Sequence, residues 1–205
     1  MTKLRHAGIR RWRWPALAVV VGMLLGFGAA LVAASSRTPG DSSVEAGFAR
    51  DMSTHHAQAV AMGMIAAKNA TDPQVRALGE DIALTQQAQI GIMGQWLRSW
   101  NLNINGSAPP MSWMPDGAKS LDNGLMPGMA TAAEMAQLEQ AEGRDLDRLF
   151  LQMMVKHHLG GIHMVDAALA ESDNPDLRWL AETMKAGQRS EIAAMERLEQ
   201  SLPAE

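Results

Sequence analysis

The chain repeats itself without gaps at an offset of 102 residues, and no other feature constrains its fold as much. The stretch FARDMSTHHAQAVAM, residues 48–62, and the stretch FLQMMVKHHLGGIHM, residues 150–164, share a phenylalanine, two methionines and a pair of adjacent histidines. The match continues to Met93 in the first copy and to Met195 in the second. Two copies of one pattern predict two similar units that pack against each other.

Each copy predicts a helical hairpin, because its periodicity is helical and no run alternates apolar residues with polar β-formers. In the first copy, Ser42-x-x-Glu45 resembles a capping box, and Asp72-Pro73 supplies an N-cap and a proline at the start of the next helix. The expected helices span residues 42–70 and 72–102.

The second copy is preceded by a loop and begins with its own capping box. Residues 103–130 are rich in Pro, Gly, Asn and Met, which predicts a long loop. Thr131-x-x-Glu134 begins a helix to residue 171, with a bend expected at Gly143 or Gly160-Gly161, and Asn174-Pro175 begins the last helix. Two hairpins that each expose one apolar stripe bury both by forming an all-α, up-down four-helix bundle.

The first 40 residues have the composition of a targeting segment. The basic stretch KLRHAGIRRWRW is followed by PALAVVVGMLLGFGAALVAA, 20 residues without a charge, which is long enough to span a bilayer. Basic residues ahead of this run place the N-terminus inside, and the small residues VAASS also suit signal cleavage. We expect residues 1–40 to be a membrane anchor or signal with a linker, and residues 41–205 to be an extracytoplasmic domain.

Composition excludes several functions for that domain. All 22 acidic residues lie after residue 40, and an acidic domain is not typical of nucleic-acid binding. The chain has no cysteine, which excludes a disulfide framework and a thiolate metal site. It contains no Glu-x-x-His pair of the di-iron bundles, no nucleophile motif and no phosphate or dinucleotide loop, so we do not expect an enzyme.

The paired histidines lie at two different places on their helices. Phe48, Met52, His55, Ala59 and Met62 are spaced 4, 3, 4 and 3 residues apart, which is a seam that faces partner helices. The second copy places His157 on the same seam, with Gly161 one turn on. His56 and His158 follow about 100° around the helix, on its flank. The small residues Ala59 and Gly161 are expected to leave room beside the imidazoles.

Soft-metal binding is the function that this pattern favours. A single seam histidine is more often a hydrogen-bonded core residue, and methionines more often fill gaps in a core. Four imidazoles and several thioethers in one small bundle are costly to bury without partners, however, and a metal ion supplies them. Imidazole and thioether without thiolate suit Cu(I) and Ag(I).

The segments FARDMSTHHAQAVAM, MPGM and FLQMMVKHHLGGIHM resemble the bacterial family called domain of unknown function 305. The family is known for ferritin-like four-helix bundles, and some members resemble periplasmic copper-resistance proteins of the CopM type. The resemblance implies Cu(I) as the bound metal. It also implies eight candidate ligands: Met52, His55, His56, Met62, Met154, His157, His158 and Met164.

Three further features have expected roles. Met126 and Met129 in the loop are expected to plug the end of the bundle; alternatively, they form an outer copper site together with Met111 and Met114. Asp51 lies one turn before His55 and is a candidate acceptor for an imidazole. Three glutamates near the C-terminus are expected to form a solvated face: Glu191, Glu196 and Glu199.

We therefore predict an extracytoplasmic, membrane-tethered or secreted bundle that binds Cu(I) for buffering, resistance or handover to a delivery partner. The alternative is a structural or protein-interaction bundle without metal, in which hydrogen bonds satisfy the histidines. A third class is an oxidase that uses copper or iron.

Overall fold

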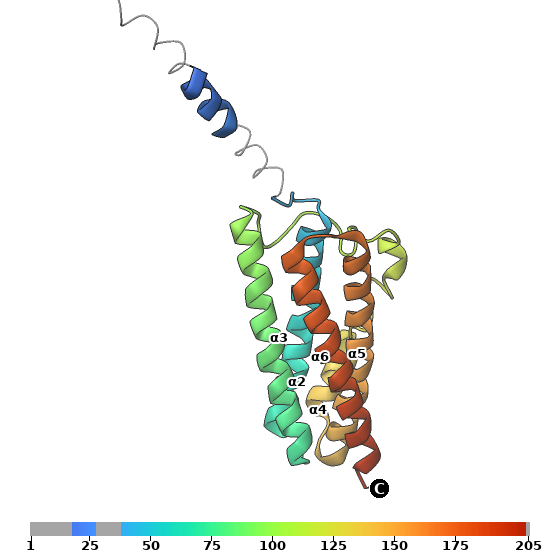
Figure 1. The fold of residues 1–205 in the computed structure, drawn as a ribbon. Helices are drawn as coiled ribbons and strands as arrows, with labels where there is room; N and C mark the ends of the chain where they lie inside the picture. Colours follow the sequence, from blue (N-terminus) through green and yellow to red (C-terminus); the bar gives the residue numbers. More distant parts are fainter. Residues whose placement is uncertain (1–17, 28–37, 204–205) are drawn as a thin grey trace, which may run out of the picture. The chain divides into compact units, whose positions relative to one another are not determined.

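The computed structural model describes residues 18–27 and 38–203, and the helices of interest belong to the unit Gly40–Glu205. Four long helices run side by side (Figure 1), and the described residues contain no β-strand. The elements are α2 (Val44–Asn69), α3 (Pro73–Ser99), the 3-10 turn η1 (Gly117–Ser120), α4 (Ala132–Gln140), α5 (Gly143–Glu171) and α6 (Pro175–Ser201). The predicted all-helical bundle is confirmed, while its ferritin-like label stays a prediction.

The predicted N-terminal targeting segment lies mostly outside the described residues. Of residues 1–37, the structure describes 18–27, which are helical. Among all the residues described, no helix is both long enough and apolar enough to cross a bilayer. The anchor or signal inferred from composition stays a prediction.

Local sequence signals begin most of the helices as expected. The side chains of Asp72 and Asn174 accept hydrogen bonds from the first turns of α3 and α6, and Thr131 with Glu134 forms a capping box at α4. The expected box at Ser42 is wrong. Ser43 is the N-cap of α2 and accepts from the N–H of Ala46, so Ala46 and not Glu45 occupies the third helical position. Glu45 accepts a hydrogen bond from Ser172 instead.

The third predicted helix is two helices. It breaks between Gln140 and Gly143, where Gly143 has a φ of +60° that a glycine adopts without steric cost. Gly160 and Gly161, the other expected bend, lie inside α5 in helical conformation. A break at residues 141–142 lets the short α4 pack its one buried residue, Leu138, against the core.

The two hairpins are antiparallel copies, and each begins beside the other's turn. The Asp147 carboxylate, near the start of α5, accepts from the N–H groups of Thr71 (2.8 Å) and Asp72 (2.9 Å) in the α2–α3 turn. At the offset of 102, its counterpart Glu45 accepts from Ser172 in the α5–α6 turn. The start of α2 therefore lies beside the end of α5, and the reverse holds at the other end.

A polar layer divides the core into two apolar clusters. The cluster around Phe48 reaches from α2 to the second half of α5, and the cluster around Phe150 reaches from α5 to the second half of α2. Between the clusters, each helix contributes buried polar residues. We call this set the histidine layer; it contains His55, His56, Gln86, His157, His158 and Gln188.

Candidate metal centre

The two seam histidines meet at the crossing of α2 and α5. The ring centroids of His55 and His157 lie 3.8 Å apart with an interplanar angle of 36°, and both side chains are buried. Because α2 and α5 are antiparallel, equivalent positions on the two helices can face each other at one level of the bundle. The convergence of the two seams that the heptad spacing predicts is confirmed.

The flank histidines are also fully buried, each against the second helix of its own hairpin. His56 Nε2 lies 2.7 Å from Gln89 Oε1 on α3, and His158 Nε2 lies 2.6 Å from Glu191 Oε2 on α6. Gln89 and Glu191 occupy equivalent positions at the offset of 102. The expectation that Glu191 belongs to a solvated face is wrong, because α6 turns this carboxylate toward the layer.

Hydrogen bonds set which nitrogen of each imidazole is free. The backbone carbonyl of Pro127 can only accept, so His55 Nε2, at 3.0 Å, carries the hydrogen. The same reasoning applies to a neutral His158 facing the carboxylate of Glu191. The Nδ1 atoms of His55, His56 and His158 are buried and have no hydrogen-bond partner. An imidazole that donates its N–H to an oxygen and leaves its other nitrogen free is the arrangement typical of a metal ligand.

Other polar atoms of the layer are also unpartnered. His157 Nε2, both amide atoms of Gln86, and Gln188 Oε1 are buried without a hydrogen bond. A buried polar group without a partner costs about 1–3 kcal/mol. Their concentration at one level of the core marks the layer as the place where a bound ligand would satisfy the most groups.

Burial keeps three of the imidazoles neutral: those of His55, His56 and His157. Desolvation lowers the pKa of His55 to about 4 and that of His56 to about 3. Burial, and then the nearby positive charge that a protonated His55 would carry, hold the pKa of His157 well below its usual range. Neutral imidazoles are the form that binds metal ions.

The candidate methionines separate into two sets, one on each side of the histidine layer. Met52 and Met164 lie in the cluster around Phe48, whereas Met62 and Met154 lie in the cluster around Phe150. Each set therefore draws one methionine from each hairpin. Met93 and Met184 join the first set and Met195 the second; none of the three was among the predicted ligands.

The space expected beside the imidazoles at Gly161 is filled. A Cβ atom at this position would lie 2.7 Å from Gln188 Oε1, so the amide of Gln188 occupies the room that the small residue leaves. Gln86 and Gln188 are equivalent at the offset of 102, and no role was predicted for either residue. A buried glutamine at the same position of each copy was the signal that could have found them.

The MPGM turn is part of the site, because it carries the carbonyl that accepts from His55. It packs backbone to backbone on α5: a Cβ at Gly160 would lie 1.9 Å from the Pro127 oxygen, and a Cβ at Gly128 would lie 2.4 Å from the Lys156 oxygen. Gly128 also has a φ of +76°. From the other hairpin, the Gln58 amide bonds to the N–H and the C=O of Ala130.

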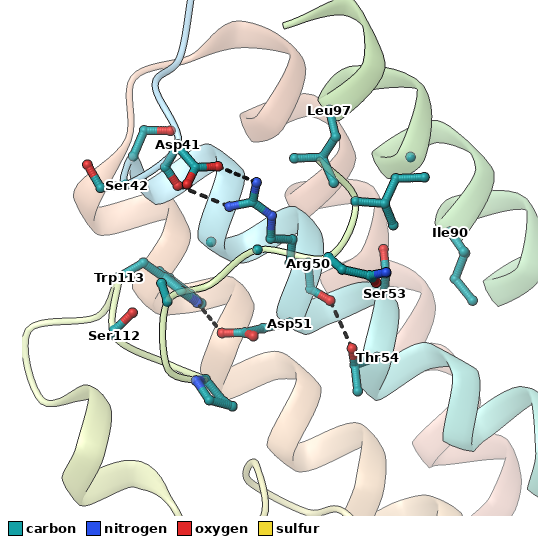
Figure 2. Close-up of a pocket in the computed structure, with 18 of the residues that line it drawn as sticks. Asp41, Ser42, Arg50, Asp51, Ser53, Thr54, Ile90, Leu97, Ser112 and Trp113 are labelled. Atoms are coloured by element: carbon teal, nitrogen blue, oxygen red, sulfur yellow. Dashed lines mark hydrogen bonds and ion pairs between the residues drawn. The ribbon is translucent and has the colours of Figure 1, made fainter. Parts of the chain in front are cut away.

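Asp51 holds the loop and not an imidazole, so the expected role is wrong. Its Oδ2 accepts from the N–H of Met111 at 2.6 Å and from Nε1 of Trp113 at 2.8 Å, as Figure 2 shows for Trp113. Burial raises the pKa of Asp51, while these hydrogen bonds oppose the rise. Met126 packs into the Phe48 cluster and Met129 packs against it, consistent with their expected role as a plug. Met111 and Met114 also lie in this cluster.

The same region holds a cavity of about 710 Å³ between α2, α3 and the loop (Figure 2). Two charged side chains in its wall are already engaged by the protein. Arg50 donates to Asp41 and to the Asn103 carbonyl, and Asp51 accepts from the loop. This cavity therefore offers fewer unpartnered polar groups than the histidine layer.

Comparison with known sequences identifies the family. The family profile named "Domain of unknown function (DUF305)" matches residues 45–199. The chain belongs to this family. No curated protein matches the chain.

Solved structures agree with the DUF305 assignment. A DUF305 protein from Streptomyces coelicolor, described as secreted, is 43% identical; the match covers 78% of this chain and 93% of that one, with a TM-score of 0.72. A DUF305 fragment from Deinococcus radiodurans is 30% identical, with coverages of 78% and 97% and a TM-score of 0.65. CopM in a Cu(I)-bound form is 21% identical, with coverages of 77% and 96% and a TM-score of 0.59, which shows a shared fold alone.

The donor set of this DUF305 bundle fits a soft metal better than a hard one. Within residues 18–27 and 38–203, no group of three or more His, Asp or Glu side chains is already arranged to hold an ion, and this holds for the four histidines of the layer as well. The layer offers imidazole nitrogens, with thioethers on either side. Those donors suit Cu(I) and Ag(I).

Proposed function

We propose that this bundle binds a soft metal ion, Cu(I) or Ag(I), at the histidine layer. The observation that carries the proposal is the set of four buried imidazoles, each with one unpartnered ring nitrogen. A structural core has no need to bury these atoms without partners, because each one costs free energy. A bound ion would satisfy them and remove that cost.

His55, His56, His157 and His158 are the proposed nitrogen ligands. Met52 and Met164 on one side of the layer, and Met62 and Met154 on the other, are the proposed sulfur ligands. Pro127, Gln89 and Glu191 orient three of the imidazoles through their Nε2 atoms. The ion supplies a soft Lewis acid and no turnover is required, so we propose a binding protein and not an enzyme.

We place this activity outside the cytoplasm, in copper buffering, resistance or handover to a delivery partner. The basic and apolar N-terminal residues favour export, and the Streptomyces relative is described as secreted. CopM, which shares the fold, has been solved with Cu(I), Cu(II) and Ag bound. These observations support the proposal by likeness, and the ligand set rests on the residues of this chain.

Competition titration tests the proposal. The purified protein is titrated with Cu(I) under anaerobic conditions against a chromogenic chelator, and separately with Ag(I). We expect both ions to bind more tightly than Zn(II) or Fe(II), and the thermal unfolding midpoint to rise with each of them. A midpoint raised by zinc and unchanged by silver would overturn the assignment.

The alternative is a structural bundle without metal. It is favoured by the hydrogen bonds that three of the four histidines already make within the protein. Under this alternative, all four single His→Ala variants bind Cu(I) as weakly as the wild type does. Tight Cu(I) binding by the wild type, together with loss of Cu(I) binding in the His→Ala variants, would exclude the structural alternative.

A further inference from the structure

The residues that hydrogen-bond to the flank histidines differ in charge between the two hairpins. His158 donates to a carboxylate, Glu191, whereas its counterpart His56 contacts an amide, Gln89, at nearly the same distance. Both histidine side chains are buried, and Glu191 is only 22% exposed. Of the acidic residues that the structure describes, Glu191 alone hydrogen-bonds to a histidine of the layer.

The histidine layer itself carries no negative charge. Its members are imidazoles and amides, and the candidate sulfur ligands are uncharged thioethers. A cation placed among neutral ligands in an apolar core is costly to desolvate. A carboxylate bonded to the far nitrogen of a ligand also strengthens that ligand as a donor.

We propose that Glu191 is a positioning residue that supplies the counter-charge for the bound ion and makes His158, rather than His56, the leading nitrogen ligand. This inference rests on the proposed function. It predicts that the two halves of a duplicated site are unequal. As the metal ion is added, it binds at the α5–α6 half first, and binding at the α2–α3 half follows.

The protein contains its own control for the role of charge. Gln89 shows that an amide oxygen at this position keeps the hydrogen bond to Nε2. Glu191→Gln therefore removes the charge while keeping the size and the acceptor. Gln89→Glu adds a charge to the other half, and the double variant exchanges the two halves.

Ag(I) alone is the probe, in chloride-free buffer, with protein labelled with ¹⁵N at histidine. Binding constants come from competition with a chelator, and ¹H–¹⁵N spectra of the imidazoles report which ring nitrogen shifts first. We expect the His158 Nδ1 to shift first in the wild type. We expect Glu191→Gln to weaken Ag(I) binding about ten- to hundredfold, and the double variant to restore affinity with His56 Nδ1 shifting first.

The order of the imidazole shifts separates a charge effect from a packing effect, because lost packing would not move the leading ligand to His56. If Glu191→Gln does not fold, Gln89→Glu in the wild-type background must strengthen binding and bring the His56 shift forward. Equal affinities in wild type and Glu191→Gln, or unchanged order in the double variant, would overturn this inference while leaving the proposed function standing. A wild type that does not bind Ag(I) would instead overturn the proposed function.

Discussion

The α2–α3 and α5–α6 hairpins are the same frame with different contacts to the histidine layer. They share the Phe, Met, His-His and Met seam, the N-cap and proline that begin the second helix, and a buried glutamine. They differ at the pairs Gln89 and Glu191, and Gln58 and Gly160, whose members touch the layer or the turn beside it. The duplication therefore accounts for the fold, while the chemistry of the site depends on positions where the copies diverged.

The pair Gln58 and Gly160 shows how different residues can serve one turn. Gln58 holds Ala130 with two hydrogen bonds from its amide. Gly160 has no side chain, and the Pro127 carbonyl therefore approaches its backbone closely. Together they place the MPGM turn so that its Pro127 carbonyl reaches His55.

Both hairpins bury a pair of histidines, and lowering the pH favours the protonation of histidine. We expect this to have the largest effect on the free energy of unfolding. In the unfolded chain a histidine titrates near pH 6.5, whereas the folded pKa of His55 is about 4 and that of His56 about 3. Between these values the unfolded state binds more protons, so the free energy of unfolding falls as the pH is lowered below 6.5. By pH 4 the loss is about 3 kcal/mol from each of these two histidines.

Urea unfolding of the metal-free protein at pH 7 and pH 4 measures this loss. The exposed His163 on α5 provides the control, because His163→Gln leaves no buried imidazole changed. That variant should keep the same pH dependence. A free energy of unfolding that is flat from pH 7 to 4 would contradict the burial of His55 and His56 as neutral imidazoles.

Variants of the residues that contact the MPGM turn are expected to have the next largest effect on stability. Gly160→Ala should destabilise the protein by about 3 kcal/mol, because its Cβ would lie 1.9 Å from the Pro127 oxygen and backbone must move. Gln58→Ala should cost about 2 kcal/mol, since it removes two hydrogen bonds. Gly187→Ala on α6 is the matched control, as no atom lies within 4 Å of its Cβ.

Free energies of unfolding from urea titrations at pH 7 rank the three variants. Gly160→Ala should also weaken Ag(I) binding, because the displaced carbonyl no longer orients His55. If Gly160→Ala is no more destabilising than Gly187→Ala, the close packing of the turn on α5 is wrong.

Variants of the flank histidines His56 and His158 compare the two hairpins directly as metal-binding halves. His158→Ala should weaken Ag(I) binding more than His56→Ala, by about tenfold or about 1.4 kcal/mol, because only His158 is backed by a carboxylate. Competition titrations of the two variants measure the difference. Greater loss in His56→Ala would mean that the α2–α3 half leads.

The smallest expected effect on stability comes from a single exposed position. There, the residue of one hairpin is replaced by the residue that the other hairpin has at the equivalent place. Ala193 on α6 corresponds to Gly91 on α3, whose Cβ would meet no atom within 4 Å. Gly91→Ala should stabilise the protein by about 0.5–1 kcal/mol, since it reduces the freedom of the unfolded chain and favours helix. Gly63→Ala is the contrasting variant, because its Cβ would lie 2.5 Å from the Gly79 oxygen; it should destabilise.

Local signals in the sequence predicted most of the frame. Caps at Asp72, Thr131 and Asn174 act within a few residues of themselves, and helical periodicity places His55 and His157 on a buried seam whatever the partner is. Two predictions based on local patterns were wrong. Glu45 matches a capping pattern but accepts a hydrogen bond from Ser172. Asp51 matches a ligand-orienting pattern but accepts from Met111 and Trp113, so in both cases a partner distant in sequence binds the carboxylate.

The sequence alone determined a duplicated helical hairpin with paired histidines on its buried face, because periodicity and capping depend on neighbours along the chain. Only the tertiary structure decided what surrounds those histidines. The antiparallel packing of α2 on α5 brings His55 into contact with His157 and divides the methionines into two sets. Pro127, Gln89 and Glu191 lie 72, 33 and 33 residues from the imidazoles they contact, and contacts at such separations depend on how whole helices pack, which no local pattern encodes.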